Sequence, residues 1–450
     1  MESIDVLDLE YSSRGRDIDI VEPTLSYLEL RYGYKIKRKW LYSNYVLDIF
    51  RIRPKVLIIA NGVGDLEHFC AVKFASLLGI KVVTFISEGD YLSADQSIQN
   101  FFWGWNSDRY CYEDLHLEWS QRNIDFIKEH IPYEARANVD IKLSGATGFD
   151  KYKLLSFEDK YIFLHKYKLE QYSKVVGIAG WGFDHFYGDY FEKFKEIYYE
   201  KEYNSIEIEN FRQSLEEVRK GYEFIIKNSP DILFILKCHP MLVNDTYSEF
   251  FELNKYPNVL ELHTEENIYD IINVSDIWLA FESTTCLEAW LLNKTTLLYN
   301  PLMSDFRRSI IHKGSFIVKE KEELLGLIRL FFENGVIDEF VQLESERKRI
   351  IKEVIGFEDG CSFIRAAQYI KELLDDAKEK KMRNVLSFVP IFVRKWLKNI
   401  VIKNSIFAYI PIIKNKRMKS LAFLSGMYTD AERQHYVDLY KSAIHEKYFL

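Results

Sequence analysis

The chain has 450 residues, of which 48% are hydrophobic and 28% are charged, and its formal net charge is −8. A single hydrophobic core stops growing at about 250 to 300 residues, so this length predicts two domains and an appendage. No stretch approaches the roughly 20 consecutive apolar residues that a membrane-spanning helix needs, which excludes an integral helical membrane protein.

The amino terminus is acidic and lacks the basic and apolar regions of a secretory signal, so we expect a cytoplasmic protein. The cysteines show neither a CxxC motif nor paired Cys/His spacing, and the sequence therefore predicts neither a zinc site nor a disulfide framework. They are Cys70, Cys111, Cys238, Cys286 and Cys361.

Charge is distributed unevenly along the chain. Residues 378–419 carry twelve Lys or Arg and one acid, a net charge of +11, so the other residues together carry −19 to give the total of −8. We expect these two parts of the chain to meet different surfaces.

In the first third of the chain, short segments of aliphatic and β-branched residues alternate with helical patterns. This alternation is typical of βαβ units with a parallel sheet. Strands are predicted at residues 4–9, 34–38, 55–60, 81–86, 109–112 and 140–145, and helices at 22–32, 66–78 and 118–131.

A second series of the same kind begins at Lys174. Strands are predicted at residues 174–180, 231–236, 258–262, 276–280 and 295–299, and helices at 205–228 and 286–292. The two series together predict an α/β protein with two doubly wound, Rossmann-like domains that face each other across a cleft. We expect the first domain at 1–155, the second at 156–375 and a basic helical extension at 376–450.

The best functional motif is Lys237-Cys238-His239-Pro240, directly after the strand at 231–236. In doubly wound sheets, ligands bind beyond the carboxyl ends of the strands, and the proline fixes the turn so that Lys237 and His239 are held at that edge. A cation and an imidazole together suit a phosphate group. The alternative is an ordinary turn at a strand end, in which His239 only caps the chain.

A second motif, Glu282-Ser283-Thr284-Thr285, follows the strand at 276–280 and opens a helix. Free NH groups at a helix start, with hydroxyl and carboxylate side chains beside them, form an anion site that needs no metal ion. Capping of the helix by Ser283 or Thr284 explains one hydroxyl but not three. Glu288, one turn into the helix, either reaches a ribose diol or is only a favourable charge in the first turn.

The order of these motifs resembles the carboxyl-terminal domain of bacterial GT-B glycosyltransferases of surface-polysaccharide assembly. The matching features are KCHP, ESTT followed by Glu288, and Pro301 after the strand at 295–299. This group includes transferases of sialic acid and of 3-deoxy-manno-octulosonic acid from CMP donors. It is similar to the CDP-glycerol glycerophosphotransferases and, more distantly, to UDP-N-acetylglucosamine 2-epimerases. The resemblance covers residues 5–374 in outline and 176–301 specifically.

The resemblance implies which residues contact the donor. His239 and Pro240 fall on the His-Pro motif of the group, and Ser283, Thr284 and Thr285 fall on its Ser/Thr motif. In the group, these motifs contact the nucleotide phosphate and the ribose. The resemblance also implies a GT-B-like fold and a nucleotide-sugar donor, and we expect neither a cofactor nor a metal ion.

Acidic residues at strand ends of the first domain are candidates for the general base that an acceptor hydroxyl needs. Glu88 and Asp90 follow the strand at 81–86. Some relatives place an acidic-acidic-Gly motif there, whereas the order here is Glu, Gly, Asp. Asp17 and Arg14, in a Gly-containing loop, are further candidates on the acceptor side. Either segment could instead be a plain solvated turn.

Other motifs receive little support. Asp17-Ile18-Asp19 formally matches the metal-binding DxD of GT-A glycosyltransferases, but it lies too early in the chain. Asn61-Gly62-Val63-Gly64 lacks the third glycine of a dinucleotide fingerprint, which argues against an NAD enzyme. P-loop, HExxH and GxSxG motifs do not occur, so neither a P-loop kinase, a zinc protease nor a serine hydrolase is indicated.

Residues 378–419 interleave apolar and aromatic residues with Lys and Arg. This pattern is typical of a segment that lies on an anionic membrane surface, which would bring an enzyme to a lipid-linked acceptor on the inner face of the plasma membrane. The alternative is a basic helical hairpin packed on the acidic body of the protein. A basic groove with stacking aromatics is not recognisable, so nucleic acid is not expected as a partner.

The sequence thus predicts a metal-independent glycosyltransferase of capsule, O-antigen or lipopolysaccharide biosynthesis. The second domain would bind the nucleotide donor, and the first would bind a glycan or lipid-linked acceptor. A CMP-linked acidic sugar is the donor that the resemblance favours. Lys237, His239 and the NH groups near 283–285 would stabilise the departing phosphate. Two alternatives stay open: polyol-phosphate transfer from CDP-glycerol, and a non-catalytic scaffold with the same fold.

Overall fold

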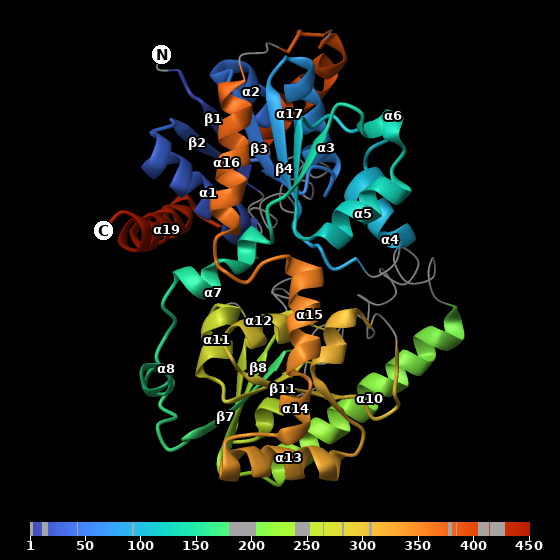
Figure 1. Ribbon diagram of the computed structural model, residues 1–450, viewed down its shortest axis with the longest axis vertical. Helices are drawn as coiled ribbons and strands as arrows, with labels where there is room; N and C mark the ends of the chain where they lie inside the picture. Colours follow the sequence, from blue (N-terminus) through green and yellow to red (C-terminus); the bar gives the residue numbers. More distant parts are fainter. Residues whose placement is uncertain are drawn as a thin grey trace. The chain divides into compact units, whose positions relative to one another are not determined.

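The computed structural model describes residues 3–10, 17–42, 44–91, 94–179, 204–238, 253–263, 265–280, 283–305, 308–376, 380–383, 385–403, 414 and 428–450. The chain forms two compact units. The first unit comprises Met1–Leu155 and Lys352–Leu450, and the second comprises Ser156–Ile351. Each unit contains a six-stranded parallel sheet with helices packed on it (Figure 1).

The sheet of the first unit has the strand order β2-β1-β3-β4-β5-β6. Its strands are β1 (Val6–Glu10), β2 (Ile36–Trp40), β3 (Val56–Ala60), β4 (Lys81–Phe85), β5 (Leu115–Glu118) and β6 (Asp140–Leu143). From β1 the chain moves to β2 on one side and then to β3 on the other, so the topological switch point lies between β1 and β3.

The helices of the first unit come from both ends of the chain. They are α1 (Asp17–Tyr32), α2 (Tyr45–Ile52), α3 (Leu66–Leu77), α4 (Ala94–Ile98), α5 (Gln121–His130), α6 (Tyr133–Arg136), α7 (Lys151–Leu154), α16 (Ser362–Asp375), α17 (Val389–Lys403) and α19 (Asp430–Tyr448). The chain returns from the second unit to the first at Lys352, within helix α15 (Glu344–Ile355).

Strand β3 shows why the central strands have continuous apolar sequences. Leu57 and Ile59 pack in a cluster with α2 and α3, whereas Val56 and Ile58 pack in another cluster with α1 and α16. Because helices cover both faces of the sheet, every position of the strand is buried and apolar.

The chain segment after the second unit completes the core of the first. Ala366, Ala367 and Ile370 of α16 are buried in the same cluster as Val6 and Ile58. Figure 1 shows α16, in orange, beside α1. The sequence predicts a second domain at 156–375, but the apolar face of α16 is buried in the core of the first unit, and residues 352–375 belong to that unit.

The described part of the carboxyl-terminal extension consists of two α-helices, a short 3-10 turn and irregular segments. Helix α19 packs on α1, and Tyr440 donates a hydrogen bond of 2.7 Å to Asp19 Oδ1. Helix α17 follows Phe388, whose ring lies 5.0 Å from that of Phe74 in α3. Residues 377–379, 384, 404–413 and 415–427 lie outside the described residues. Among the described helices, none combines the length and the hydropathy needed to cross a membrane.

The sheet of the second unit has the strand order β12-β11-β10-β7-β8-β9. Its strands are β7 (Lys174–Ala179), β8 (Ile232–Lys237), β9 (Val259–Leu262), β10 (Ile277–Ala280), β11 (Thr295–Tyr299) and β12 (Phe316–Val318). Its helices include α8 (Lys160–Lys166), α10 (Ser205–Lys227), α11 (Ile268–Val274), α12 (Thr285–Leu291), α13 (Lys321–Asn334) and α14 (Asp338–Gln342). The switch point of this sheet lies between β7 and β10.

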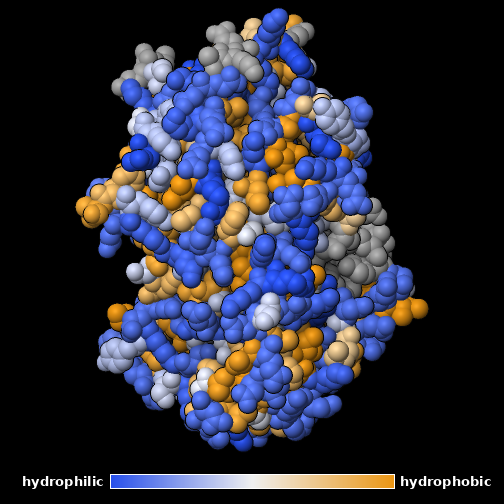
Figure 2. Space-filling model, viewed as in Figure 1, coloured by the Kyte–Doolittle hydropathy of each residue, from blue (hydrophilic) through white to orange (hydrophobic). Residues whose placement is uncertain are grey.

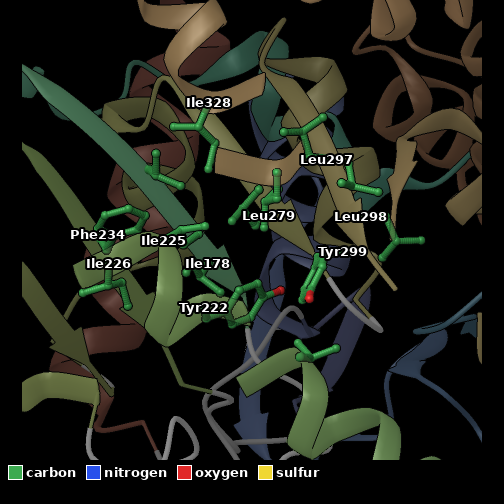
Figure 3. Close-up of a cluster of buried hydrophobic side chains, with 14 of the residues drawn as sticks. Ile178, Tyr222, Ile225, Ile226, Phe234, Leu279, Leu297, Leu298, Tyr299 and Ile328 are labelled. Atoms are coloured by element: carbon green, nitrogen blue, oxygen red, sulfur yellow. The ribbon is translucent and has the colours of Figure 1, made fainter. Parts of the chain in front are cut away.

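The core of the second unit lies between this sheet and two helices, α10 and α13. Figure 3 shows Tyr222 and Ile225 of α10 and Ile328 of α13 directed toward Ile178 and Leu279 on the central strands β7 and β10. The surface seen in Figure 2 is mostly hydrophilic with scattered hydrophobic patches, in keeping with the charged composition of the chain.

Residues 109–112 do not form the strand that the sequence analysis predicts, and β5 lies at Leu115–Glu118 instead. This strand carries two polar residues, His116 and Glu118, which are buried and hydrogen-bonded to each other at 2.8 Å. They interrupt the apolar pattern by which buried strands are recognised, and for this reason the strand was missed.

Candidate functional site

The two predicted donor motifs follow strands on either side of β7 in the second unit. In the parallel register, Ala179 of β7 pairs with Lys237 of β8 on one side and with Ala280 of β10 on the other. The segment from Ser283 follows β10, which borders the switch point. The structure therefore brings the described parts of both motifs to one edge of the sheet, where doubly wound folds bind ligands. His239, Pro240 and Glu282 lie outside the described residues.

Lys237 is the last residue of β8, and its side chain is largely buried. Its Nζ donates a hydrogen bond to the main-chain oxygen of His263, which follows β9. The ammonium group thus lies at the carboxyl edge of the sheet and ties the ends of two neighbouring strands together.

The three hydroxyl residues at the start of α12 differ in their local partners. Ser283 Oγ accepts a hydrogen bond of 3.2 Å from the NH of Thr285, and Thr285 Oγ1 accepts one of 2.9 Å from Trp278 Nε1. Thr284 is the N-cap residue, and its side chain makes no capping hydrogen bond. The Ser283 and Thr285 hydroxyls therefore accept structural hydrogen bonds, whereas the Thr284 side chain takes no part in capping the helix.

Glu288 lies in the first turn of α12 and is buried. A carboxylate inside a protein is costly unless it is paired or hydrogen-bonded. Its position therefore differs from that of an exposed charge that only complements the dipole of a helix.

Glu88 and Asp90 follow β4 in the first unit and have different surroundings. Glu88 is exposed, whereas Asp90 forms an ion pair with Arg122 at 3.2 Å. Gly89 between them lies against Trp119, and a Cβ atom on Gly89 would be 2.5 Å from the indole ring. This contact fixes the loop, so that Glu88 faces solvent while Asp90 is held by arginine.

Asp17 is the first residue of α1, because this helix begins five residues before the start that the sequence predicts. Arg14 lies outside the described residues. Asp19 is buried and bonded to Lys151 Nζ at 2.9 Å and to Tyr440. Both oxygens of Asp19 are thus engaged by protein groups.

A buried polar network behind the Glu88 loop was not predicted. His116 bonds to Thr84 Oγ1 and to Glu118 Oε1, both at 2.8 Å. The same Glu118 oxygen accepts a hydrogen bond of 3.1 Å from Tyr91. Burial is the largest single effect and lowers the pKa of His116, but the hydrogen bond to Glu118 and the negative charges of Glu118 and Glu113 together outweigh it, so that the pKa is raised. This network anchors Tyr91, three residues after Glu88.

The switch point of the first unit carries further polar groups. Asp8 in β1 is buried, and its carboxyl oxygens have no hydrogen-bond partner among the described residues. Burial and the neighbouring Glu10 raise the pKa of Asp8, and burial raises that of Glu10 to about 7. Asn61, after β3, has a φ of 50° and a buried amide oxygen without a donor in the described structure. The sequence signal for Asn61 is an Asn-Gly turn after a buried strand.

The sequence matches no family model, and no curated protein matches it either. Solved structures do match over most of the chain. The MnaA–UDP complex of S. aureus is 12% identical with a TM-score of 0.54, covering 85% of this chain and 100% of that protein. The Methanocaldococcus jannaschii UDP-GlcNAc 2-epimerase in complex with UDP-GlcNAc and UDP is 12% identical with a TM-score of 0.52, covering 82% and 100%.

These similarities establish the fold. The chain has the GT-B-like architecture of two doubly wound α/β domains, which confirms the fold class predicted from the sequence. At such low identity the similarity is one of fold, and the function has to be argued from the residues of this chain.

Proposed function

We propose that the protein is a glycosyltransferase of cell-surface polysaccharide biosynthesis, which transfers a sugar from a nucleotide donor to a glycan or lipid-linked acceptor. The observation that carries this proposal is the convergence of Lys237 and Thr284 at one carboxyl edge of the second sheet, beside its switch point. The solved structures of similar fold contain UDP or UDP-GlcNAc, which supports a nucleotide-sugar ligand. A CMP-linked acidic sugar is our first choice of donor.

In this proposal, the second unit stabilises the departing nucleotide phosphate. The Thr284 hydroxyl and the NH groups at the start of α12 donate hydrogen bonds to phosphate oxygens, and Lys237 and His239 supply positive charge. Preorganised donors of this kind stabilise the charge that develops as the bond to the sugar breaks. No metal ion is needed for this step.

The first unit would bind the acceptor. Glu88 is the better candidate for the general base, because it is exposed whereas Asp90 is already paired with Arg122. A base has to reach the proton of the acceptor hydroxyl. Asp90 would then hold the loop in place, and Asp17 and Arg14 would contribute on the acceptor side.

A thermal-shift screen with CMP, CDP, UDP and their sugar conjugates tests the donor site, because a ligand that binds the folded state raises its melting temperature. We expect a CMP conjugate to give the largest shift. Thr284→Val should reduce that shift, since it removes a hydroxyl at nearly constant shape. The control is Thr295→Val, at the opposite, amino end of β11 in the same sheet.

The outcomes separate the proposed activity from its alternatives. Transfer of glycerol phosphate from CDP-glycerol to an acceptor would show that the protein is a polyol-phosphate transferase. Conversion of UDP-GlcNAc without any acceptor would indicate an epimerase instead. If the protein bound no nucleotide at any concentration, the remaining explanation would be a non-catalytic scaffold. If His239→Ala left turnover with a proven donor unchanged, the phosphate site would be wrongly assigned.

We also propose that the protein works on an anionic membrane surface. Five apolar side chains that we call the α17 stripe, Leu386, Val389, Val393, Trp396 and Leu397, are 43% to 71% exposed. They recur at helical spacing, and Arg394 is exposed among them. An exposed apolar stripe with basic neighbours is typical of helices that lie in a membrane interface.

A further inference from the structure

Three side chains with different metal-ligand atoms converge at the carboxyl ends of β8 and β9. Cys238 Sγ lies 3.5 Å from Glu261 Oε1, and His263 Nε2 lies 3.3 Å from the same oxygen. The three ligand atoms all lie within 4.8 Å of one another. This cluster combines a thiol, a carboxylate and an imidazole, which distinguishes it from a patch of surface acids.

The pairing of the two strands holds the cluster together. The NH of Cys238 donates a hydrogen bond of 2.9 Å to the main-chain oxygen of Leu262, so Cys238 continues the parallel ladder beyond β8. Glu261 and His263 are two residues apart and therefore lie on the same side of β9. The backbone that positions the three ligands is thus part of the sheet.

The distances fit a tetrahedral zinc site. With zinc bonds of about 2.3 Å to sulfur and about 2.1 Å to nitrogen or oxygen, tetrahedral angles place sulfur about 3.6 Å from oxygen and nitrogen about 3.4 Å from oxygen. The corresponding distances here are 3.5 Å and 3.3 Å. A zinc ion would therefore need little rearrangement of these two pairs.

We propose that Cys238, Glu261 and His263 bind one divalent cation of the zinc class, which links the edge strand β9 to β8. Thiolate, imidazole and carboxylate are the ligands that zinc takes in proteins. On binding, the thiol releases its proton to solvent, and its hydrogen bond to Glu261 is replaced by two bonds to the metal. Thiolate and carboxylate together balance the two charges of the cation.

Burial and access both suit this role. Cys238 is 1% exposed, and the side chain of Glu261 is 6% exposed, so water is largely excluded from two of the ligands. The side chain of His263 is 39% exposed, so this proposed ligand is open to solvent. The metal site goes beyond the proposed sugar transfer, which requires no metal.

Titration of the chelator-treated, full-length protein with Zn²⁺ tests the proposal. We expect one ion per chain, and we expect Co²⁺ to give a thiolate-to-cobalt charge-transfer band. Cys238→Ser should abolish this band, and both Cys238→Ser and His263→Gln should weaken Zn²⁺ binding at least about 10-fold. Cys361→Ser, a free cysteine of the first unit, is the matched control and should change neither.

Absence of Zn²⁺ binding by the wild-type chain would overturn the proposal, as would a charge-transfer band that persists in Cys238→Ser. His263→Gln keeps the main-chain oxygen that accepts from Lys237, so this variant is expected to fold if the serine variant does not. Zn²⁺ should raise the melting temperature of the wild type by several degrees and that of His263→Gln by much less. Equal shifts in the two proteins would also count against the site.

Discussion

Asp150 is a buried carboxyl group whose protonation is linked to folding. Its Oδ2 accepts a hydrogen bond of 2.6 Å from the NH of Phe363, the second residue of α16. Burial raises the pKa of Asp150 to about 7, whereas an unfolded aspartate titrates at about 3.9. Between these values the folded chain holds a proton that the unfolded chain has released. Stability therefore falls as the pH rises through this window.

Asp150→Asn tests this linkage, because asparagine keeps an oxygen acceptor for Phe363 but cannot ionise. As the pH rises from about 5 to about 7, we expect the wild type to lose stability relative to the variant, on the order of 1 kcal/mol per pH unit. Urea denaturation at several pH values measures the difference. A difference that stays constant with pH would contradict the raised pKa.

Gly89 is a second residue at which structure and function are coupled. Gly89→Ala would place a methyl group 2.5 Å from the ring of Trp119, whose indole NH holds the main-chain oxygen of Ile86 at 2.9 Å. We expect a loss of about 1 to 3 kcal/mol in stability and a lower kcat, because the loop that carries Glu88 has to shift.

The control for Gly89→Ala is Gly326→Ala. Gly326 lies inside α13, and a Cβ atom there meets no atom within 4 Å. Alanine at that position should raise stability by about 0.5 to 1 kcal/mol, because it lowers the cost of ordering the helix. Denaturation curves measure the stability of both variants, and turnover assays measure their kcat. A Gly89→Ala protein with wild-type stability would show that the loop adapts freely.

At the scale of single residues, the sequence predicts the location of the two proposed donor motifs but not the partners of their side chains. Lys237 and Thr284 lie at a strand's carboxyl end and a helix start, as expected, because hydrophobic periodicity places these ends. That Thr285 bonds to Trp278 depends on contacts within the fold. The cluster of Cys238, Glu261 and His263 is not predictable for the same reason, since its side chains come from the ends of two different strands.

Among the elements, α16 shows most clearly what packing adds to sequence. Its apolar face predicts a helix that covers a core, but amphipathicity carries no information on which core it covers. The structure places Ile370 against the first sheet. The central strands were predictable because both their faces are covered, whereas β5 was not, because His116 and Glu118 satisfy each other inside the sheet.

Ile370→Ala should destabilise the first unit by about 2 to 5 kcal/mol and leave the second unit intact, since it opens a cavity in the first core only. Hydrogen exchange resolved by peptide measures both units in one experiment. Gln368→Ala, on the exposed face of the same helix, is the matched control. Faster exchange in the strands of the second unit would place α16 in the other core.

For the whole molecule, the α17 stripe predicts binding to anionic vesicles. Replacement of Trp396 and Leu397 by serine should weaken binding by at least about 10-fold, because it removes two apolar side chains from the interface. Binding should also fall as salt rises, since basic residues contribute about 1 kcal/mol each near the surface.

The control for the vesicle experiment is Trp105→Ser. Trp105 is 52% exposed and Trp396 is 51% exposed, and both lie in the first unit, but Trp105 is far from the basic extension in sequence. Cosedimentation with vesicles that contain phosphatidylserine measures binding of all three proteins. If Trp105→Ser weakened binding as much as the double replacement, general hydrophobicity would account for the effect and the stripe would not.

The path of the chain through its two units also has a consequence during synthesis. The first sheet is complete at residue 143, but α16, which covers one of its faces, begins at Ser362. All of the second unit is translated in between. At about 5 to 20 residues per second, the cluster around Val6 and Ile58 lacks α16 for about 10 to 40 seconds on the ribosome. During this interval the nascent first unit exposes apolar surface that α16 later covers, which makes it prone to aggregation.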